Sequence, residues 1–157
     1  MKQYTASFTG HRIIAREDLA TLPQRLDETI ASLIQQGIVY FGSGYARGFD
    51  TLAAQAVLRA RDKNDAVKLI AVLPCTDQSE KWPEADQEVY WKLLTVADKV
   101  VCVINRPYED DCMKKRNLRL ITHNSVCITY MKHWRSGTAQ TVRMAVAQGL
   151  TVINLAE

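Results

Sequence analysis

The sequence has little that would mark a membrane protein, a disulfide scaffold or a metal-binding module. It contains four cysteines, and no two of them are spaced as C-x-x-C, so neither a zinc ribbon nor a thioredoxin-type site is indicated. No apolar run approaches the roughly 18 residues of a membrane-spanning helix, and the first residues contain no apolar secretion core. We therefore predict a cytoplasmic protein that has no membrane association, no metal site and no cofactor.

An excess of charge of one sign is also missing. Lys and Arg number 20 against 17 Asp and Glu, and the resulting net charge of +3 is too small to indicate a nucleic-acid partner by itself. Apolar residues make up 47% of the chain and charged residues 24%, which is typical of a globular protein and excludes a disordered chain. The 157 residues suit one domain, and we expect residues 1–157 to form it.

Short apolar runs alternate with helical patterns along the chain. The runs that predict strands cover residues 4–9, 38–42, 68–73, 100–104, 126–131 and 151–155. Five helical patterns lie between them, and the clearest is the stripe formed by Leu22, Leu26 and Ile30. The alternation predicts an α/β fold that is Rossmann-like, with three layers. Its doubly wound, mostly parallel sheet would have about six strands and helices on both faces. The pattern leaves the strand order open.

In an open parallel sheet, ligands bind beyond the carboxyl ends of the strands, so the loops there are the first places to search for a site. The loop after the second predicted strand reads S-G-Y-A-R-G-F-D from Ser43 to Asp50. Its glycines allow tight turns, the following helix aims free N–H groups at an anion, and Arg47 can pair with phosphate oxygens. A phosphate site and a purely structural strand–helix turn are equally compatible with this loop.

The loop after the fifth predicted strand has a similar design. Ser136, Gly137 and Thr138 precede the last predicted helix, where a hydroxyl can cap the helix or hold a phosphate. Taken alone, an ordinary N-cap is the better interpretation, but two such loops at strand ends strengthen the case for an anion site. Neither loop is a Walker A sequence or a G-x-G-x-x-G fingerprint, so an ordinary NAD site is not supported.

The end of the first predicted strand carries Thr9, Gly10, His11 and Arg12. A single histidine is more often a hydrogen-bonded structural residue than a catalyst, although its place at a strand end favours a functional role somewhat. Arg12 would neutralise the charge of an anionic ligand.

The motif from Ser43 to Asp50 resembles the S-G-x-A-R-G-x-D motif of the DNA-processing protein A family. Arg116 and Asn117 resemble the R-N pair of that family, and the segment from Ser136 to Thr141 resembles its S-G-x-x-x-T element. The opening F-T-G-H-R, from Phe8 to Arg12, is similar to that of small, single-domain, YoqJ-like members of the SLOG superfamily, which are related to a prophage protein. The resemblance covers most of the chain and implies a Rossmann-like domain that binds nucleotides, nucleotide-derived ligands or nucleic acid.

The same superfamily contains the lonely-guy phosphoribohydrolases, which carry P-G-G-x-G-T-x-x-E. In this chain Thr141 stands where their catalytic Glu would be, and glycosidic cleavage needs a carboxylate. We therefore favour binding over catalysis and name no catalytic residue, although Asp50 or Glu84 could substitute for the missing carboxylate.

The resulting prediction is a protein that senses or sequesters a nucleotide or a nucleotide-derived molecule at the carboxyl edge of the sheet. One alternative is a nucleoside-monophosphate phosphoribohydrolase, and another is a single-stranded DNA-binding protein like the DNA-processing family. Dimers are common in the resembled families, so a homodimer is compatible with the resemblance. The predicted ligand-binding residues are Thr9, Gly10, His11, Arg12, Ser43, Gly44, Ala46, Arg47, Gly48, Asp50, Arg116, Asn117, Ser136, Gly137 and Thr138.

Overall fold

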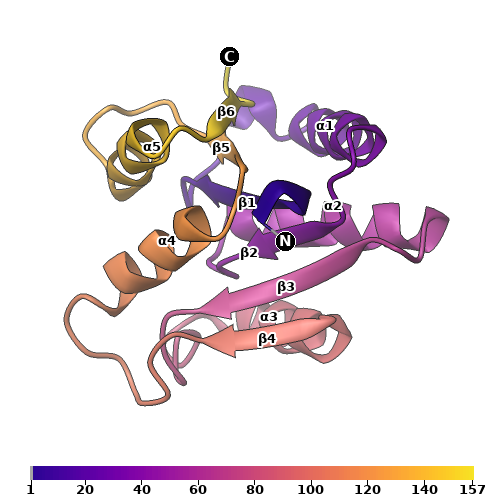
Figure 1. The fold of residues 1–157 in the computed structure, drawn as a ribbon. Helices are drawn as coiled ribbons and strands as arrows, with labels where there is room; N and C mark the ends of the chain where they lie inside the picture. The colour runs from indigo at the N-terminus through magenta and orange to yellow at the C-terminus, as the bar shows by residue number, and fades with distance from the viewer. Residues whose placement is uncertain (1) are drawn as a thin grey trace.

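A computed structural model describes residues 2–157 of the chain. Six strands alternate with five α-helices along the sequence, as the apolar pattern predicts (Figure 1). The strands are β1 (Thr5–Gly10), β2 (Tyr40–Ser43), β3 (Lys68–Leu73), β4 (Lys99–Cys102), β5 (Val126–Tyr130) and β6 (Thr151–Asn154). The helices are α1 (Leu22–Gln35), α2 (Phe49–Lys63), α3 (Glu84–Val96), α4 (Cys112–Thr122) and α5 (Gly137–Ala147), with short 3-10 turns at Lys2–Tyr4 and Arg16–Asp18.

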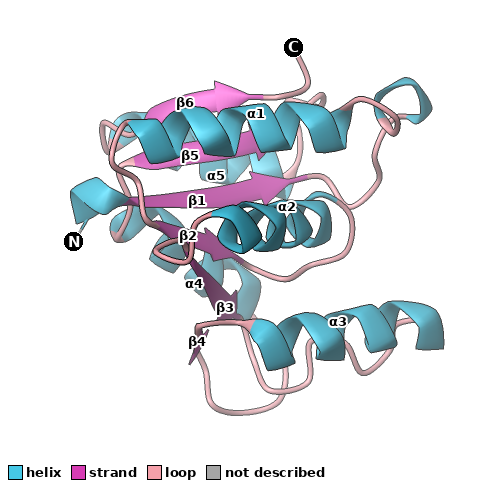
Figure 2. Cartoon of the chain, turned by 90° about the vertical axis from the view of Figure 1, so that its right-hand side faces the viewer, coloured by secondary structure: helices cyan, strands magenta, loops and turns pink. Residues whose placement is uncertain are grey.

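The strands form one sheet in the order β4-β3-β2-β1-β5-β6, and every pair of neighbours is parallel. Helices α1, α2 and α3 cover one face, and α4 and α5 cover the other (Figure 2). The predicted Rossmann-like, doubly wound fold is therefore confirmed, and the strand order that the pattern left open is now known. Within the described residues, no helix has both the length and the apolar character needed to cross a membrane.

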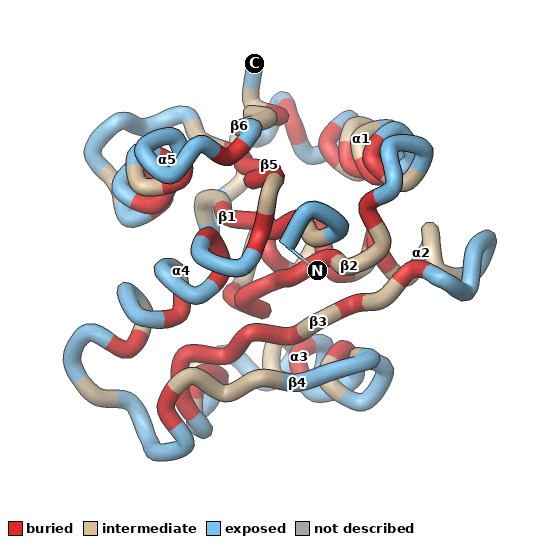
Figure 3. The backbone as a smooth tube through the Cα atoms, in the orientation of Figure 1, coloured by how far each residue is buried: buried red, intermediate tan, exposed pale blue. Residues whose placement is uncertain are grey.

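The hydrophobic core lies mainly between the central strands and the helices α1 and α2 (Figure 3). The stripe on α1 that the sequence predicts is buried, because Leu22, Leu26 and Ile30 lie on one side of the helix, against the sheet. β5 is buried along its whole length, whereas β4 lies at the edge and is partly exposed. The best-covered part of the sheet is therefore its centre, around β1.

The ends of five strands differ from the predicted ranges by one or two residues. Tyr4 lies in a 3-10 turn instead of the first strand, and β2 begins at Tyr40 instead of Ile38. β4 ends at Cys102, although the N–H of Val103 still donates to the carbonyl of Leu73 at the end of β3. These differences arise because Ile38, Ile104 and Leu155 are buried although they lie outside the strands, so the apolar pattern extends beyond the strand ends.

The strand order places a topological switch point between β1 and β5. From β1 the chain proceeds outward through β2 and β3 to β4, and then returns by way of α4 to β5 on the other side of β1. The register pairs Gly10 with Tyr130, so the carboxyl ends of the two strands lie at the same level. Ligands of doubly wound sheets bind in the crevice at this position.

Candidate functional site

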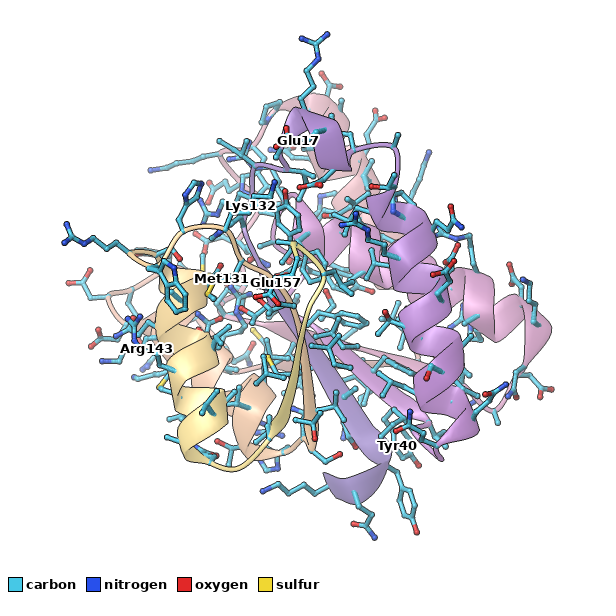
Figure 4. The ribbon with its side chains drawn as sticks, turned by 90° about the horizontal axis from the view of Figure 1, so that it is seen from above. Glu17, Tyr40, Met131, Lys132, Arg143 and Glu157 are labelled. Carbon is cyan, nitrogen blue, oxygen red and sulfur yellow. The ribbon has the colours of Figure 1, made fainter. Side chains whose placement is uncertain are left out.

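A cavity of about 640 Å3 lies at the switch point, within the size range of small-molecule sites. It opens beyond the carboxyl ends of β1 and β5, at the end of the sheet where Met131 and Lys132 lie and opposite to Tyr40, the first residue of β2 (Figure 4). The lining comes from four parts of the chain: residues 8–13 and Ala15; Ala46 and Asp50; Met113, Arg116, Asn117 and Leu120; and Tyr130, Lys132, His133 and residues 136–138.

The structure brings most of the predicted site residues to this cavity. Those that line it are Thr9, Gly10, His11, Arg12, Ala46, Asp50, Arg116, Asn117, Ser136, Gly137 and Thr138. Ser43, Gly44, Arg47 and Gly48 are not among the lining residues. The two loops that look alike in the sequence are therefore placed differently.

Residues 44–46 of the β2–α2 loop are buried, and the loop is held by the protein itself. Ser43 Oγ donates to the carbonyl of Asp50 over 3.0 Å and accepts from the N–H of Tyr45 over 3.2 Å. The carbonyl of Gly44 accepts from Arg116 Nη1 over 2.7 Å. Gly48 has a φ of +81°, and a Cβ there would come 2.1 Å from the carbonyl oxygen of Arg12, so only glycine fits. These contacts give the glycines of this loop a structural role.

Arg47 turns away from the cavity, toward α3. Its guanidinium lies 3.7 Å from a carboxylate oxygen of Asp86 and 5.3 Å from the ring centre of Trp82. The direction of this side chain follows from the neighbouring helix, which sequence reasoning could not place beside it.

Asp50 is the acidic residue that borders the cavity within the described part of the chain. Its side chain lies in the first turn of α2, and the residue is only 5% exposed. One carboxylate oxygen, Oδ2, accepts from the N–H of Ala46 over 3.3 Å, while Oδ1 has no hydrogen-bond partner among residues 2–157. Burial raises the pKa of Asp50 to about 6, against the opposing influence of Arg116, the Ala46 N–H and Arg12.

Arg116 is buried beside the β2–α2 loop. Besides its bond to Gly44, its Nε donates to Asn117 Oδ1 over 2.8 Å and its Nη1 approaches Gln78 Oε1 at 3.4 Å. Burial lowers the pKa of Arg116, and the nearby Asp50 opposes that shift. The arginine carries positive charge in the wall of the cavity, while its donors are directed at protein acceptors, including Met113 Sδ, which lies 3.6 Å from Nη2.

The β5–α5 loop is more exposed than residues 44–46 of the β2–α2 loop. Ser136 caps α5, because its Oγ accepts from the N–H of Ala139 over 3.0 Å. Within residues 2–157 the N–H groups of Gly137 and Thr138 have no hydrogen-bond partner. Both residues line the cavity, as does the exposed Arg12, for which the described residues contain no ion-pair partner. The positive end of the α5 dipole and a cation therefore border the same space.

His11 holds the start of the same loop. Its Nε2 accepts from the N–H of Lys132 over 2.8 Å and from the N–H of His133 over 3.2 Å. Burial and the neighbouring His133 lower the pKa of His11. Since Nε2 accepts two hydrogen bonds, the neutral form with the proton on Nδ1 fits this geometry, and a structural role is favoured.

Lys132 and Tyr130 line the cavity and were not predicted. Lys132 Nζ lies 2.7 Å from Asp18 and 3.2 Å from Glu17, and Figure 4 shows the Glu17 and Lys132 side chains close together. Tyr130 donates to Asp18 over 2.6 Å. Lys132 directly follows the predicted strand 126–131, and this position could have indicated from the sequence that it lies near the site. No sequence pattern around Asp18 indicates its contacts with Lys132 and Tyr130. Its two carboxylate partners largely compensate the charge of Lys132.

No group of three His, Cys, Asp or Glu side chains suitable for a metal ion is found among the described residues. The cavity instead combines backbone donors, one exposed arginine and one buried carboxylate. This set of groups suits an organic anion that also carries hydrogen-bond donors.

Comparison with known proteins identifies the family to which this chain is similar. A family model described as the YspA SLOG family (YpsA) matches residues 14–150. The UPF0398 protein of Bacillus pumilus is 30% identical over 64% of this chain and 54% of its own length. The SPbeta prophage-derived protein YoqJ of Bacillus subtilis is 28% identical, over 79% of this chain and 80% of YoqJ. This chain spans about half the length of the UPF0398 proteins that it matches.

Among solved structures, DNA processing protein A from Helicobacter pylori is similar, with a TM-score of 0.68 and 18% sequence identity. The similarity covers 96% of this chain and 64% of that protein, whose structure is described in terms of a single-stranded DNA binding mode. At this level of identity the likeness shows a shared fold.

Proposed function

This chain belongs to the YspA SLOG family, and from that membership and the geometry of the cavity we propose that it binds a nucleotide or a nucleotide-derived molecule. One observation carries the proposal. The N–H groups of Gly137 and Thr138 border the cavity at the switch point together with Arg12, and residues 2–157 supply no anion to them. A phosphate bound there would receive backbone hydrogen bonds, the helix dipole and a guanidinium.

The proposed ligand site is smaller than the set predicted from the sequence. It comprises the predicted residues that line the cavity, and it leaves out Ser43, Gly44, Arg47 and Gly48. Arg12 is the proposed phosphate partner in place of Arg47, because Arg47 is directed at Asp86.

The test removes a single N–H group from the proposed phosphate site. Proline is favoured at the first position of a helix, and Ser136 already has the extended backbone that a residue before proline needs. Gly137→Pro therefore deletes one donor with little change in structure, whereas Gly137→Ala keeps the donor and adds a Cβ in open space. Calorimetric titration with AMP, GMP, CMP and UMP should show weaker binding for Gly137→Pro, by about 5- to 10-fold.

The alanine variant is the matched control, because it adds a Cβ as proline does but keeps the N–H, so it should bind the monophosphates more tightly than Gly137→Pro. If Gly137→Pro binds the monophosphates as tightly as Gly137→Ala, the phosphate does not lie at α5. If none of the four monophosphates binds to the wild type, the proposal fails for this class of nucleotide.

We also propose that the ligand is bound without cleavage of its glycosidic bond. The Thr141 hydroxyl donates to the carbonyl of Gly137 over 3.0 Å, inside its own helix, and neither Thr141 nor Glu84 lines the cavity. Incubation of the protein with AMP, followed by chromatography, should therefore release no adenine at an enzymatic rate, which is about 1 per second or faster. Turnover at such a rate would point to Asp50 as the catalytic carboxylate.

Binding of single-stranded DNA is the rival proposal, and the fold shared with DNA processing protein A is the observation behind it. Such binding would require several cations along a strand and would weaken steeply with salt. Lys132, the other cation in the lining besides Arg12 and the buried Arg116, is compensated by Glu17 and Asp18. A fluorescent deoxythymidine oligomer titrated at two salt concentrations distinguishes the two proposals.

A further inference from the structure

The carboxylate of Asp50 is the feature that the proposed phosphate site does not explain. A phosphate is repelled by a carboxylate, yet Asp50 borders the same cavity as Arg12 and the start of α5. Its Oδ1 is buried and has no hydrogen-bond partner among residues 2–157. A buried acceptor without a donor costs free energy, so the group calls for a partner that the described chain does not supply.

An ion pair within the protein does not account for this carboxylate. The donors of Arg116 are directed at Gly44, Asn117 and Gln78, and no arginine of the described residues has a guanidinium nitrogen within 4.0 Å of Asp50. The arginines act on Asp50 only over a longer range.

The conformation of the loop does not require the charge either. Ser43 holds the carbonyl of Asp50, and Thr51 Oγ1 donates to the carbonyl of Ala46 over 2.9 Å. The single bond that Asp50 Oδ2 accepts from the Ala46 N–H could equally be accepted by an asparagine. No contact within the described residues therefore accounts for the negative charge or for the second oxygen.

The cavity therefore has two chemically opposite parts, one for an anion and one for a hydrogen-bond donor. A ribonucleoside 5′-phosphate has both, because its phosphate and its 2′- and 3′-hydroxyls lie on opposite sides of one sugar ring. These hydroxyls are present whatever the base. An internal nucleotide of DNA has no sugar hydroxyl, since its 3′-oxygen is esterified and its 2′-position carries hydrogen.

We infer that Asp50 accepts a hydrogen bond from a ribose hydroxyl, so that the cavity selects ribonucleoside 5′-phosphates over dideoxynucleotides and over DNA strands. The inference rests on the proposed phosphate site and adds the class of sugar to it. Asp50 forms part of the wall of the same cavity that Gly137, Thr138 and Arg12 line.

The experiment compares two sugars on the same base. After a screen of AMP, GMP, CMP and UMP, the tightest binder is titrated beside its 2′,3′-dideoxy counterpart, so that base and phosphate cancel in the ratio of the two affinities. A hydrogen bond to a charged acceptor predicts a ratio of about 10- to 100-fold in the wild-type protein. The ratio should fall toward 1 in Asp50→Ala and to an intermediate value in Asp50→Asn.

Asp86→Asn serves as the matched control, because Asp86 also lies in the first turn of a helix but faces Arg47 outside the cavity. For Asp86→Asn, the ratio of the affinities for the ribose and the dideoxy monophosphate should equal that of the wild type. Thermal unfolding of each variant establishes that it is folded. If Asp50→Ala does not fold, Asp50→Asn still provides the test, because asparagine keeps an acceptor for the Ala46 N–H.

The possible results distinguish a failure of the role inferred for Asp50 from a failure of the proposed phosphate site. Equal affinities for the two sugars in the wild type would overturn the role of Asp50 while leaving the phosphate site in place. A sugar preference that persists in Asp50→Ala and Asp50→Asn would also overturn it. Absence of binding by all four monophosphates, together with binding of a deoxythymidine oligomer, would overturn both the inference and the proposed function.

Discussion

The β2–α2 loop and the β5–α5 loop have similar sequences and opposite roles in the fold. Both follow a strand, contain serine and glycine, and lead into a helix. Residues 44–46 of the first loop are buried and bonded to protein partners, among them Arg116 and Asp50. The second loop caps its helix through Ser136 and presents the free N–H groups of Gly137 and Thr138 to a cavity.

The difference shows that a glycine-rich turn at a strand end is no evidence of a phosphate site by itself. What distinguishes the two loops is burial, because residues 44–46 are covered by other parts of the protein, whereas residues 132–135 and Gly137 are exposed. In the first loop a side chain and the helix α4 occupy the space that a ligand would need, because Arg116 approaches Gly44 closely. Each of the following predictions tests this contrast.

The largest effect is expected from adding the same methyl group to a glycine in each loop. Gly48→Ala places a Cβ against the Arg12 carbonyl at a φ of +81°, so it should lower the free energy of unfolding by about 3 kcal/mol. Gly137→Ala meets no atom within 4 Å and should change stability by less than about 1 kcal/mol. Urea titration of both variants measures the difference, and equal losses would contradict the contrast.

A smaller loss is expected when the support of the first loop is removed. Arg116→Ala deletes the bonds to Gly44 and Asn117 and the packing of the buried arginine stem, so unfolding should become easier by about 2 kcal/mol. Arg119→Ala, on the exposed side of the same helix, should change stability by less than about 0.5 kcal/mol. Comparable midpoints for the two variants would show that Arg116 does not hold the loop.

Arg47→Ala should have a small effect on stability and none on ligand affinity. Its pair with Asp86 is partly exposed and its contact with Trp82 is loose, which together contribute about 0.5–1 kcal/mol. Arg12→Ala should do the reverse, with little change in stability and weaker binding of the monophosphates. Calorimetry and thermal unfolding of the two variants give both readouts, and loss of affinity in Arg47→Ala would return this residue to the site.

The smallest expected effect is on the pH dependence of stability, through His11, which holds the β5–α5 loop. Because the pKa of His11 is lowered in the folded protein, the unfolded chain takes up a proton first as the pH falls below neutral. The contribution of His11 to stability is therefore complete above the usual pKa of histidine and is lost as the pH falls through and below it. His11→Gln cannot titrate, so its unfolding midpoint should depend less on pH in that range.

Asp50 changes the stability in the opposite direction, because its pKa is raised to about 6 in the folded protein. Its contribution to the free energy of unfolding is largest in acid and is lost as the pH rises to about 6. Comparing wild type with His11→Gln cancels this contribution. Identical pH profiles for the two proteins would remove His11 from the support of the second loop.

The sequence by itself determined the fold class and pointed to the edge of the sheet where the cavity lies. Apolar runs and helical stripes are local consequences of which side chains are buried, and they predicted all six strands and five helices. In a parallel sheet the residues after each strand must share one edge, which is why Gly10 and Gly137 could be brought together before their contacts were known. Asn117 lies in the middle of α4, and only the family resemblance indicated it.

Only the tertiary structure decided which loop is open and which groups are left for a ligand. Arg47 points at Asp86 and Arg116 lies under Gly44 because helices distant in the sequence pack beside the β2–α2 loop. Likewise, Oδ1 of Asp50 has no partner because the packing of residues 2–157 places no donor beside it. Local pattern encodes burial, whereas the pairing of polar groups depends on contacts between segments that no periodicity records.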